Sequence, residues 1–267
     1  MRYTKVTGDW LIDAVVPGAR PGTWDGQPAM VPRDLAGAAR CHGVSGWVRK
    51  RARSTGWRVD GVEDDVRATS ARHQRAMWDL GVIDGALGSA NVPYIVVKGP
   101  VLAEAYHDHP QLRSYLDLDV VVRPTDLRGA ILALEAKGLD VLDVNWPLLQ
   151  RQGVHELRLS TPTGGLLDLH WSLLPGIHNG RSPDVETLLE RADWLRLGDL
   201  LVAVLDWADT AVHVASHAAA SGGDRLIWCA DLLAEAARVS RRIDSDQEGC
   251  GTWESTTRPR RRTGRCG

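Results

Sequence analysis

The chain has 267 residues, of which 43% are hydrophobic and 25% charged, values that are typical of globular proteins and exclude collagen, coiled-coil arrays and wholesale disorder. The length suits one domain with a helical appendage, or two small domains around a shared core. The formal net charge of -2 excludes a strong positive field over the whole molecule, so any polyanion must be bound locally.

Membrane and secretion signals are not evident. The longest apolar runs, at residues 92–97 and 200–205, are far shorter than the roughly 18 to 20 residues that cross a bilayer. The first ten residues carry no apolar h-region and no small-residue cleavage site, so we expect no secretory signal. The four cysteines lack a C-x-x-C pair, which disfavours a zinc ribbon or a disulfide framework. We therefore expect reduced thiols, a cytoplasmic location and no membrane partner.

Residues 1–90 are predicted to form a mostly helical N-terminal region. Gly and Pro cluster in the first 30 residues, which predicts irregular structure there. Helical spacing of apolar residues then predicts one helix between Pro32 and Gly43 and a longer one over 62–87, which begins with three acidic residues where the helix dipole favours them.

Residues 91–198 are predicted to form an α/β or α+β core. Short apolar runs alternate with helical segments, and the turn-forming residues 161–165 join the last two runs, which predicts strand, helix, strand, helix and then a hairpin. The predicted strands cover residues 92–97, 116–122, 155–160 and 166–171.

The C-terminal part divides into two predicted regions. Residues 199–243 have a helical pattern from 199 to 240. Residues 244–267 have almost nothing to bury, so we expect a disordered tail. Its basic run at 258–262 is typical of a solvated tail, with an RNA- or phosphate-binding arm as the alternative.

Two aspartates alternate on the second predicted strand. In the sequence Leu116-Asp117-Leu118-Asp119, followed by three valines, Asp117 and Asp119 share one face because strand side chains alternate. Neighbouring carboxylates repel, and both stay ionised only with a cation between them. Oxygen ligands suit Mg²⁺ or Mn²⁺, so the pattern predicts a metal site. The alternative is an exposed edge strand, which the valines disfavour.

A third carboxylate, Asp168, lies on the last predicted strand with His170 on the same face. Three acids on neighbouring strands would hold two metals, the apparatus of in-line phosphoryl or nucleotidyl transfer. For His170 itself a structural role is favoured, in which it orients Asp168 or bonds a backbone carbonyl.

The segment Lys98-Gly99-Pro100 follows the first predicted strand. Glycine permits close approach of a ligand, the following helix offers free N–H groups, and the lysine supplies a point charge suited to a polyphosphate. The chain has only four lysines among 32 basic residues, which makes a lysine at this place more informative.

Other histidine patterns are weaker. His213 and His217 lie four apart on a predicted helix, a spacing that can bind zinc, but the Glu of an H-E-x-x-H motif is missing, so core packing or a hydrogen bond is favoured. The cluster at 107–109 precedes a proline and is typical of a solvated turn. The chain has no G-x-S-x-G, P-loop or dinucleotide fingerprint, which disfavours a serine hydrolase, a P-loop NTPase and a Rossmann enzyme.

In this order the motifs resemble the uncharacterised nucleotidyltransferase family of the DNA polymerase β superfold. The resemblance runs from about residue 33 to residue 238, and the ordered set is more specific than any single motif. The matching parts are residues 95–100, Arg113, residues 117–124, 155–157 and 168–171, and the helical segment with His213, His217 and Asp231.

The resemblance implies an α+β fold, in which a polymerase β-like core of a short mixed sheet with helices is flanked by N- and C-terminal helical regions. It implies that Asp117 and Asp119 bind the catalytic metals, Mg²⁺ or Mn²⁺, and that Asp168 completes the triad. Lys98 and Gly99 would replace the glycine-serine phosphate loop of better-known relatives, and Arg113 would lie near the triphosphate.

The leading interpretation is a metal-dependent nucleotidyltransferase that moves a nucleoside monophosphate from an NTP substrate to a hydroxyl. The acceptor stays open among RNA, a protein side chain and a small molecule such as an aminoglycoside or a peptide product. The net charge disfavours a long nucleic acid, and nothing indicates DNA binding. The main alternative is a degenerate, non-catalytic member that binds a nucleotide or a partner, because Leu116 stands where the family usually has a small residue and the tail matches nothing in the family. A metal-dependent phosphohydrolase is a third possibility.

Overall fold

The computed structural model describes the backbone of residues 4–20, 23–24, 31–145, 148, 151–173 and 183–248, with side chains as far as residue 240. The basic run at 258–262, Cys250 and Cys266 lie outside these ranges. Within them, every helix is too short or too polar to span a lipid bilayer. The predicted α+β class, a sheet flanked by N- and C-terminal helical regions, is confirmed.

A seven-stranded mixed sheet forms the centre of the described part, in the order β3-β4-β5-β2-β1-β7-β6. β2 pairs antiparallel with β1 and parallel with β5, so the strand with the two aspartates lies inside the sheet and not at its edge. The strands are β1 (Tyr94–Val97), β2 (Asp117–Val122), β3 (Asp140–Val141), β4 (Glu156–Ser160), β5 (Leu166–His170), β6 (Asp193–Leu197) and β7 (Leu200–Val204).

The alternation of β1 and β2 divides the core between the two faces of the sheet. Leu118, Val120 and Val122 pack on the face covered by α4 (Val62–Ser89) and α6 (Leu127–Glu135). The alternate residue Val121 packs with residues of α8 (Val185–Arg191) on the other face. Because strand side chains alternate, Asp117 and Asp119 belong to this second face.

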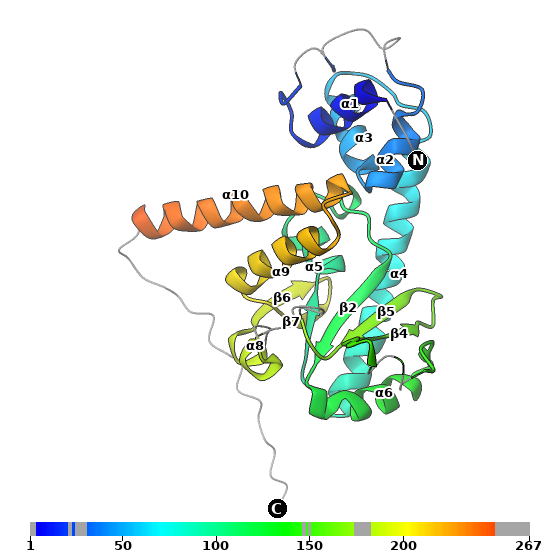
Figure 1. Cartoon of the computed structure of the whole chain (residues 1–267), viewed down its shortest axis with the longest axis vertical. Helices are drawn as coiled ribbons and strands as arrows, with labels where there is room; N and C mark the ends of the chain where they lie inside the picture. Colours follow the sequence, from blue (N-terminus) through cyan, green and yellow to red (C-terminus); the bar gives the residue numbers. More distant parts are fainter. Residues whose placement is uncertain are drawn as a thin grey trace, which may run out of the picture.

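The N-terminal helices lie together at one end of the molecule (Figure 1). Their buried side chains form a separate hydrophobic cluster that includes tryptophans. They are α1 (Lys5–Val15), α2 (Leu35–His42) and α3 (Ser45–Ser54). The prediction of irregular structure throughout the first 30 residues is wrong for α1, which Thr4 caps by accepting a hydrogen bond from the Thr7 N–H. Gly43, at φ +71°, ends α2 as predicted.

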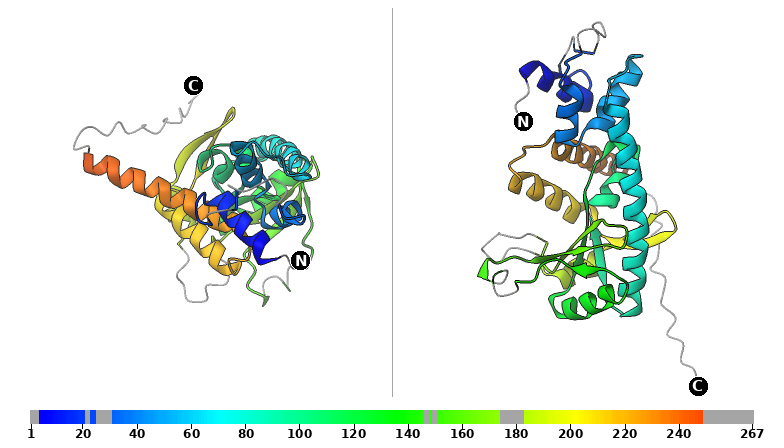
Figure 2. Two further views of the ribbon diagram at one scale, coloured as in Figure 1. Left: turned by 90° about the horizontal axis from the view of Figure 1, so that it is seen from above. Right: turned by 90° about the vertical axis from the view of Figure 1, so that its right-hand side faces the viewer.

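Long helices connect this cluster to the sheet. α4 runs from the N-terminal helices along the length of the sheet (Figure 2). α9 (Trp207–Ala220) and α10 (Leu226–Glu248) follow the last strand, and Ile227 and Ala230 at the start of α10 pack into the N-terminal cluster. α10 includes residues 244–248, so the predicted disordered tail is wrong for that stretch, and the rest of the tail lies outside the described residues.

The β6–β7 hairpin corrects a third prediction. Residues 200–204 form a strand, whereas the sequence pattern predicts helix from residue 199. The run Leu200-Leu201-Val202-Ala203-Val204 is apolar without a helical or alternating period, and such short runs fit a buried strand as well as a helix. The division into regions 1–90, 91–198, 199–243 and 244–267 stays a prediction.

Gly46 places α3 directly against the turn that precedes the aspartate strand. A Cβ on Gly46 would lie 2.8 Å from the Leu112 Cα and closer still to the Gln111 carbonyl oxygen. We expect Gly46→Ala to destabilise the protein by roughly 1–3 kcal/mol, because overpacking forces the backbone apart. A Cβ on Gly81 of α4 would meet no atom within 4 Å. We therefore expect Gly81→Ala to stabilise the protein by about 1 kcal/mol, because alanine has the higher helix propensity. Urea unfolding of both variants checks this, and equal stabilities would contradict the close packing.

Candidate active site

Three carboxylates meet where β2 and β5 run side by side. The parallel register places Asp119 beside Asp168 and Asp117 beside Leu166. Asp119 and Asp168 are 3% and 6% exposed, and Asp117 is half-buried. The structure therefore brings together the three predicted aspartates.

Asp119 is held by two basic side chains. The Lys98 Nζ lies 2.8 Å and the His170 Nε2 lies 3.0 Å from the same Asp119 oxygen, Oδ1. Burial opposes ionisation, but Lys98 and His170 outweigh it and hold the pKa of Asp119 well below its ordinary range. His170 thus orients Asp119 and not Asp168, and its Nδ1 lies 3.2 Å from the Glu156 carboxylate.

The backbone at Lys98 and Gly99 turns sharply between β1 and α5 (Gly99–Ala105). Lys98 has φ +50° and Gly99 has φ +39°, and such a value is unusual for a residue with a side chain. A Cβ on Gly99 would lie 3.3 Å from the Asp117 carbonyl oxygen. The loop is therefore pressed against the start of β2, which brings the Lys98 ammonium to Asp119.

Asp168 is engaged by Arg158 from β4, its direct cross-strand neighbour. Arg158 donates from Nε to Oδ1 at 2.8 Å and from Nη2 to Oδ2 at 3.1 Å. The hydrogen bonds to Asp168 raise the pKa of Arg158 above its ordinary value. The Arg158 side chain is 48% exposed. Its guanidinium is therefore already partly hydrated, and its ion pair with Asp168 is weakened by solvent.

The Asp117 carboxylate makes no hydrogen bond or ion pair with the described residues. Burial raises the pKa of Asp117, and the carboxylates of Asp119 and Asp168 raise it further. The positive charges of Lys98 and Arg158 lower the pKa of Asp117 again, but only in part.

The pKa of Asp117 predicts a pH-dependent stability. A carboxyl group with a raised pKa in the fold costs stability as the pH rises above its unfolded value of about 3.8. In EDTA we expect Asp117→Asn to unfold at a higher temperature than the wild type at neutral pH, and the difference to shrink as the pH falls toward 3.8. Thermal unfolding across this range measures the effect, and a less stable variant at neutral pH would show that ionised Asp117 stabilises the fold.

Arg113 reaches the site indirectly. Its guanidinium forms a buried pair with Asp231 of α10, at 2.9 Å from Nε to Oδ1 and 3.0 Å from Nη2 to Oδ2. The His107 Nε2 lies 2.9 Å from the same carboxylate, so His107 is a buried partner and not part of a solvated turn. The Arg113 Nη1 donates to the Gly99 carbonyl at 3.4 Å. Arg113 therefore connects α10 to the Lys98-Gly99 loop.

A small cavity of about 110 Å³, here called the Lys98 cavity, adjoins these residues. It is lined by Lys98, Gly99, Arg113–Asp117, Asp119, His217, Arg225 and Trp228. The sequence did not predict that His217 of α9, Trp228 of α10 and Arg225, just before α10, line this cavity. The four-residue spacing of His213 and His217 was a partial signal.

The two α9 histidines are neutral at physiological pH. Burial and then the charge of Lys98 lower the pKa of His213 to about 3 and that of His217 to about 4. The His217 ring packs edge-on against Trp228, with centroids 4.6 Å apart. Both ring nitrogens of His213 lack a hydrogen-bond partner among the described residues, so core packing describes His213 better than a hydrogen bond.

The carboxylate oxygens fit a hard divalent cation in their chemistry. Within the described ranges, no three His, Cys, Asp or Glu side chains converge in an arrangement ready to hold a metal ion. Lys98 and Arg158 instead take the positions of counter-charges to Asp119 and Asp168. A bound metal ion would therefore displace Lys98 from Asp119 and Arg158 from Asp168. Among the described residues, the Asp117 carboxylate has no such ion pair to break.

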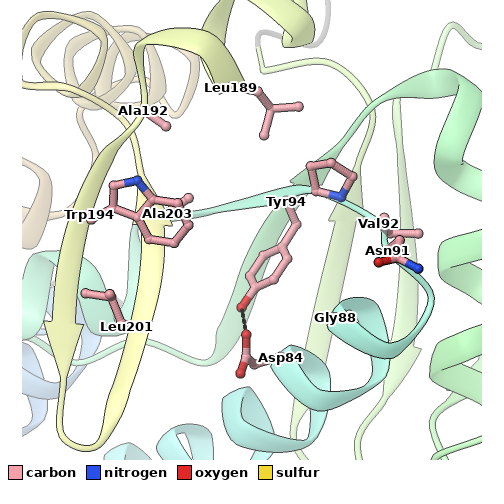
Figure 3. A pocket seen from close by; sticks show the side chains of 11 residues that line it. Asp84, Gly88, Asn91, Val92, Tyr94, Leu189, Ala192, Trp194, Leu201 and Ala203 are labelled. Carbon is pink, nitrogen blue, oxygen red and sulfur yellow. Dashed lines mark hydrogen bonds between the residues drawn. The ribbon is translucent and has the colours of Figure 1, made fainter. Parts of the chain in front are cut away.

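A different cavity, of about 350 Å³, lies at the opposite end of β1 between α4 and the β6–β7 hairpin (Figure 3). Tyr94 donates a hydrogen bond of 2.7 Å to Asp84 there, and Trp194 and Leu201 from the hairpin form an apolar wall. Asp84 is the single carboxylate in this lining, so the cavity lacks the clustered acids of the β2–β5 site.

Three solved structures are similar to parts of this chain. A solution structure of the antibiotic-resistance factor ANT(2'')-Ia is similar at 13% identity and a TM-score of 0.42, over 66% of this chain and 97% of that chain. The structure of ANT(2'')-Ia in complex with adenylyl-2''-tobramycin is similar at 14% and 0.39, over 64% and 97%. The lincomycin-bound lincosamide antibiotic adenylyltransferase LnuA is similar at 16% and 0.37, over 50% and 82%. No curated protein matches.

The family comparison covers most of the sequence. The model of the uncharacterised nucleotidyltransferases matches residues 29–247, a range that includes Lys98, Arg113 and the three aspartates. The resemblance noted in the sequence is therefore confirmed. This chain belongs to the uncharacterised nucleotidyltransferase family.

Proposed function

We propose that the protein is a cytoplasmic enzyme that transfers a nucleoside monophosphate from an NTP to a hydroxyl acceptor by a two-metal mechanism. The observation that carries this proposal is the meeting of Asp117, Asp119 and Asp168 on adjacent strands, opposite the Lys98-Gly99 loop. Family membership supports the transferase class. The donor atoms of the three aspartates are those that Mg²⁺ or Mn²⁺ prefers.

In this proposal Asp117, Asp119 and Asp168 hold the cations. A cation held there would supply Lewis-acid chemistry: it would lower the pKa of the attacking hydroxyl and neutralise charge on the leaving pyrophosphate. The Lys98 ammonium is released from Asp119 and binds the phosphates as a point charge. Gly99 allows the loop backbone to approach them. Arg113 adds positive charge to the Lys98 cavity and, through the Gly99 carbonyl, holds the loop in place.

The bond changes of the proposed reaction balance. The acceptor oxygen forms a bond to the α-phosphorus and its proton passes to solvent. The bond from the α-phosphorus to the bridging oxygen breaks, and pyrophosphate leaves with that oxygen. Water is the competing acceptor, so a phosphohydrolase would release products from the NTP without the hydroxyl compound.

Titration calorimetry of each of the four NTPs, with Mg²⁺ or Mn²⁺, tests the nucleotide part of the proposal. We expect at least one NTP to bind the wild type only when the cation is present, and the Asp117→Asn, Asp119→Asn double variant to lose that binding. Absence of binding by the wild type would refute the proposal and favour the non-catalytic, partner-binding alternative. Equal binding by the double variant would remove the aspartates from the site.

A further inference from the structure

A larger cavity lies on the other side of Leu116 and Asp117. It has a volume of about 380 Å³ and is bounded by α4, the start of β2 and the turn between β4 and β5; we call it the α4 cavity. Pockets of this size bind small molecules or the end of a longer chain. Its lining includes Arg72, Arg75, Asp79, Leu116, Asp117 and Thr163.

The α4 cavity and the Lys98 cavity share a wall. Tyr115, Leu116 and Asp117 line both, and the Leu116 side chain is 60% exposed. A molecule in the α4 cavity therefore lies against Asp117, one of the three carboxylates, and next to whatever the Lys98 cavity holds. An acceptor must occupy such a position for its hydroxyl to reach the α-phosphorus of a bound NTP.

The turn that closes the cavity is firmly attached to α4. Asp79, 1% exposed, accepts hydrogen bonds from the Thr161 hydroxyl at 2.7 Å, the Thr163 N–H at 3.3 Å and the Thr163 hydroxyl. A Cβ on Gly165 would lie 2.9 Å from the Thr161 oxygen and 3.2 Å from an Asp79 oxygen. The Asp79 charge is thus satisfied by donors on the turn and not by the arginines of the cavity.

Two arginines of α4 face this cavity without partners. Arg72 is half-buried and Arg75 is exposed, and neither makes a hydrogen bond or an ion pair with the described part of the chain. The other arginines of α2, α3 and α4 are paired, as Arg67 is with Asp64 at 2.9 Å. Planar guanidinium groups match phosphate oxygens in a bidentate manner. Two of them match the charge of a phosphate monoester or of two successive phosphodiesters.

We propose that the α4 cavity is the acceptor subsite and that Arg72 and Arg75 bind a phosphate group of the acceptor close to its reactive hydroxyl. This proposal rests on the proposed nucleotidyl transfer and names its acceptor class, a phosphorylated hydroxyl compound. A small phosphorylated molecule and the 3′ end of a short RNA carry the same chemistry. The Arg residues fix the phosphate, and the hydroxyl points past Leu116 toward Asp117.

Binding of two probes to the purified full chain tests the subsite: ribose 5-phosphate by calorimetry, and a 5′-labelled oligoribonucleotide with a free 3′-hydroxyl by fluorescence anisotropy. Salt near about 0.15 M suppresses non-specific phosphate contacts. The test variant is Arg72→Gln with Arg75→Gln. The matched control is Arg58→Gln with Arg67→Gln, which removes the same charge from the lining of a different cavity.

We expect the wild type and the control to bind one of the probes alike, and the test variant to bind it at least about tenfold more weakly, because each lost charged hydrogen bond is worth about that factor. Binding of ribose 5-phosphate would indicate a small phosphorylated acceptor, and binding of the oligoribonucleotide would indicate the 3′ end of an RNA. Binding of neither probe by the wild type, equal binding by the test variant, or an equal loss in the control overturns the proposal.

Titration of the NTPs with Mg²⁺ in the same proteins separates the two proposals. The subsite is supported if the test variant binds the probe more weakly while both variants bind the NTP with an affinity within about twofold of the wild type. NTP binding without any arginine-dependent probe binding refutes the subsite alone. A wild type that binds a probe but no NTP refutes the transfer function, and with it the role of the α4 cavity as an acceptor subsite.

Discussion

The double substitution Asp117→Asn with Asp119→Asn is expected to lower the proposed nucleotide transfer by at least about a thousandfold, because it removes the charges that would hold the cations of that reaction. The fold should persist with lower stability, because Lys98 loses its charged partner Asp119. Asparagine keeps the shape of aspartate and an oxygen that accepts from Lys98 and His170. The change also removes the buried charge and the carboxylate repulsion that raise the pKa of Asp117.

Transfer of α-labelled nucleotide and the circular dichroism spectrum are measured together. Asp140→Asn with Asp193→Asn is the matched control, since both are exposed aspartates on strands of the same sheet. The control should retain wild-type transfer. Activity of the Asp117, Asp119 variant within about tenfold of the wild type would remove these carboxylates from the chemistry.

Asp231→Ala is expected to cost about 3–5 kcal/mol of stability, the usual effect of removing one partner from a buried ion pair. Arg113 and Asp231 are each 3% exposed, so the substitution leaves the Arg113 guanidinium buried without its counter-charge. Burial opposes ionisation of Asp231, but Arg113 and His107 outweigh it and keep the pKa of Asp231 low. The pair also joins α10 to the Gly99 carbonyl, so we expect NTP affinity to fall as well.

Urea unfolding measures the loss, with Asp224→Ala as the control. Asp224 is exposed and bonds only weakly to Trp228, at 3.4 Å, so its removal should change stability by less than about 0.5 kcal/mol. Replacement of both partners, Arg113→Met with Asp231→Leu, should cost less than Asp231→Ala because no charge stays buried alone. Equal stability of the Asp231 and Asp224 variants would show that the pair contributes nothing.

The pairing of Asp117 with Asp119 was predictable because it depends only on the two-residue repeat of side chains along a strand. Alternation along a strand places Asp117 and Asp119 on one face whatever the sheet does, and the valines after them indicate a buried strand. The Lys98-Gly99 loop was predictable for the same reason, because it directly follows an apolar strand in the sequence. Its contact with Asp119 follows from the antiparallel pairing of β1 and β2, which sets Val97 opposite Asp119.

Contacts that depend on cross-strand register and helix packing were not predictable. Arg158 meets Asp168 only because β4 and β5 pair in one particular register, and a shift of one residue would turn Arg158 to the other face. His217 and Trp228 reach the Lys98 cavity through the packing of α9 and α10. Arg113 was expected near the triphosphate, but its partner Asp231 is 118 residues away in sequence, and no local pattern reveals such a pair.

The most direct test of the central claim is the fate of the α- and γ-phosphates. The protein is incubated with Mg²⁺, a heat-inactivated cell extract as the acceptor pool, and each NTP labelled at one phosphate or the other. Nucleotidyl transfer predicts that the α-label joins an acceptor while the γ-label leaves in pyrophosphate, and that the Asp117, Asp119 double variant does neither. A γ-label on the acceptor, or release of phosphate without any α-labelled product, would contradict the proposed function.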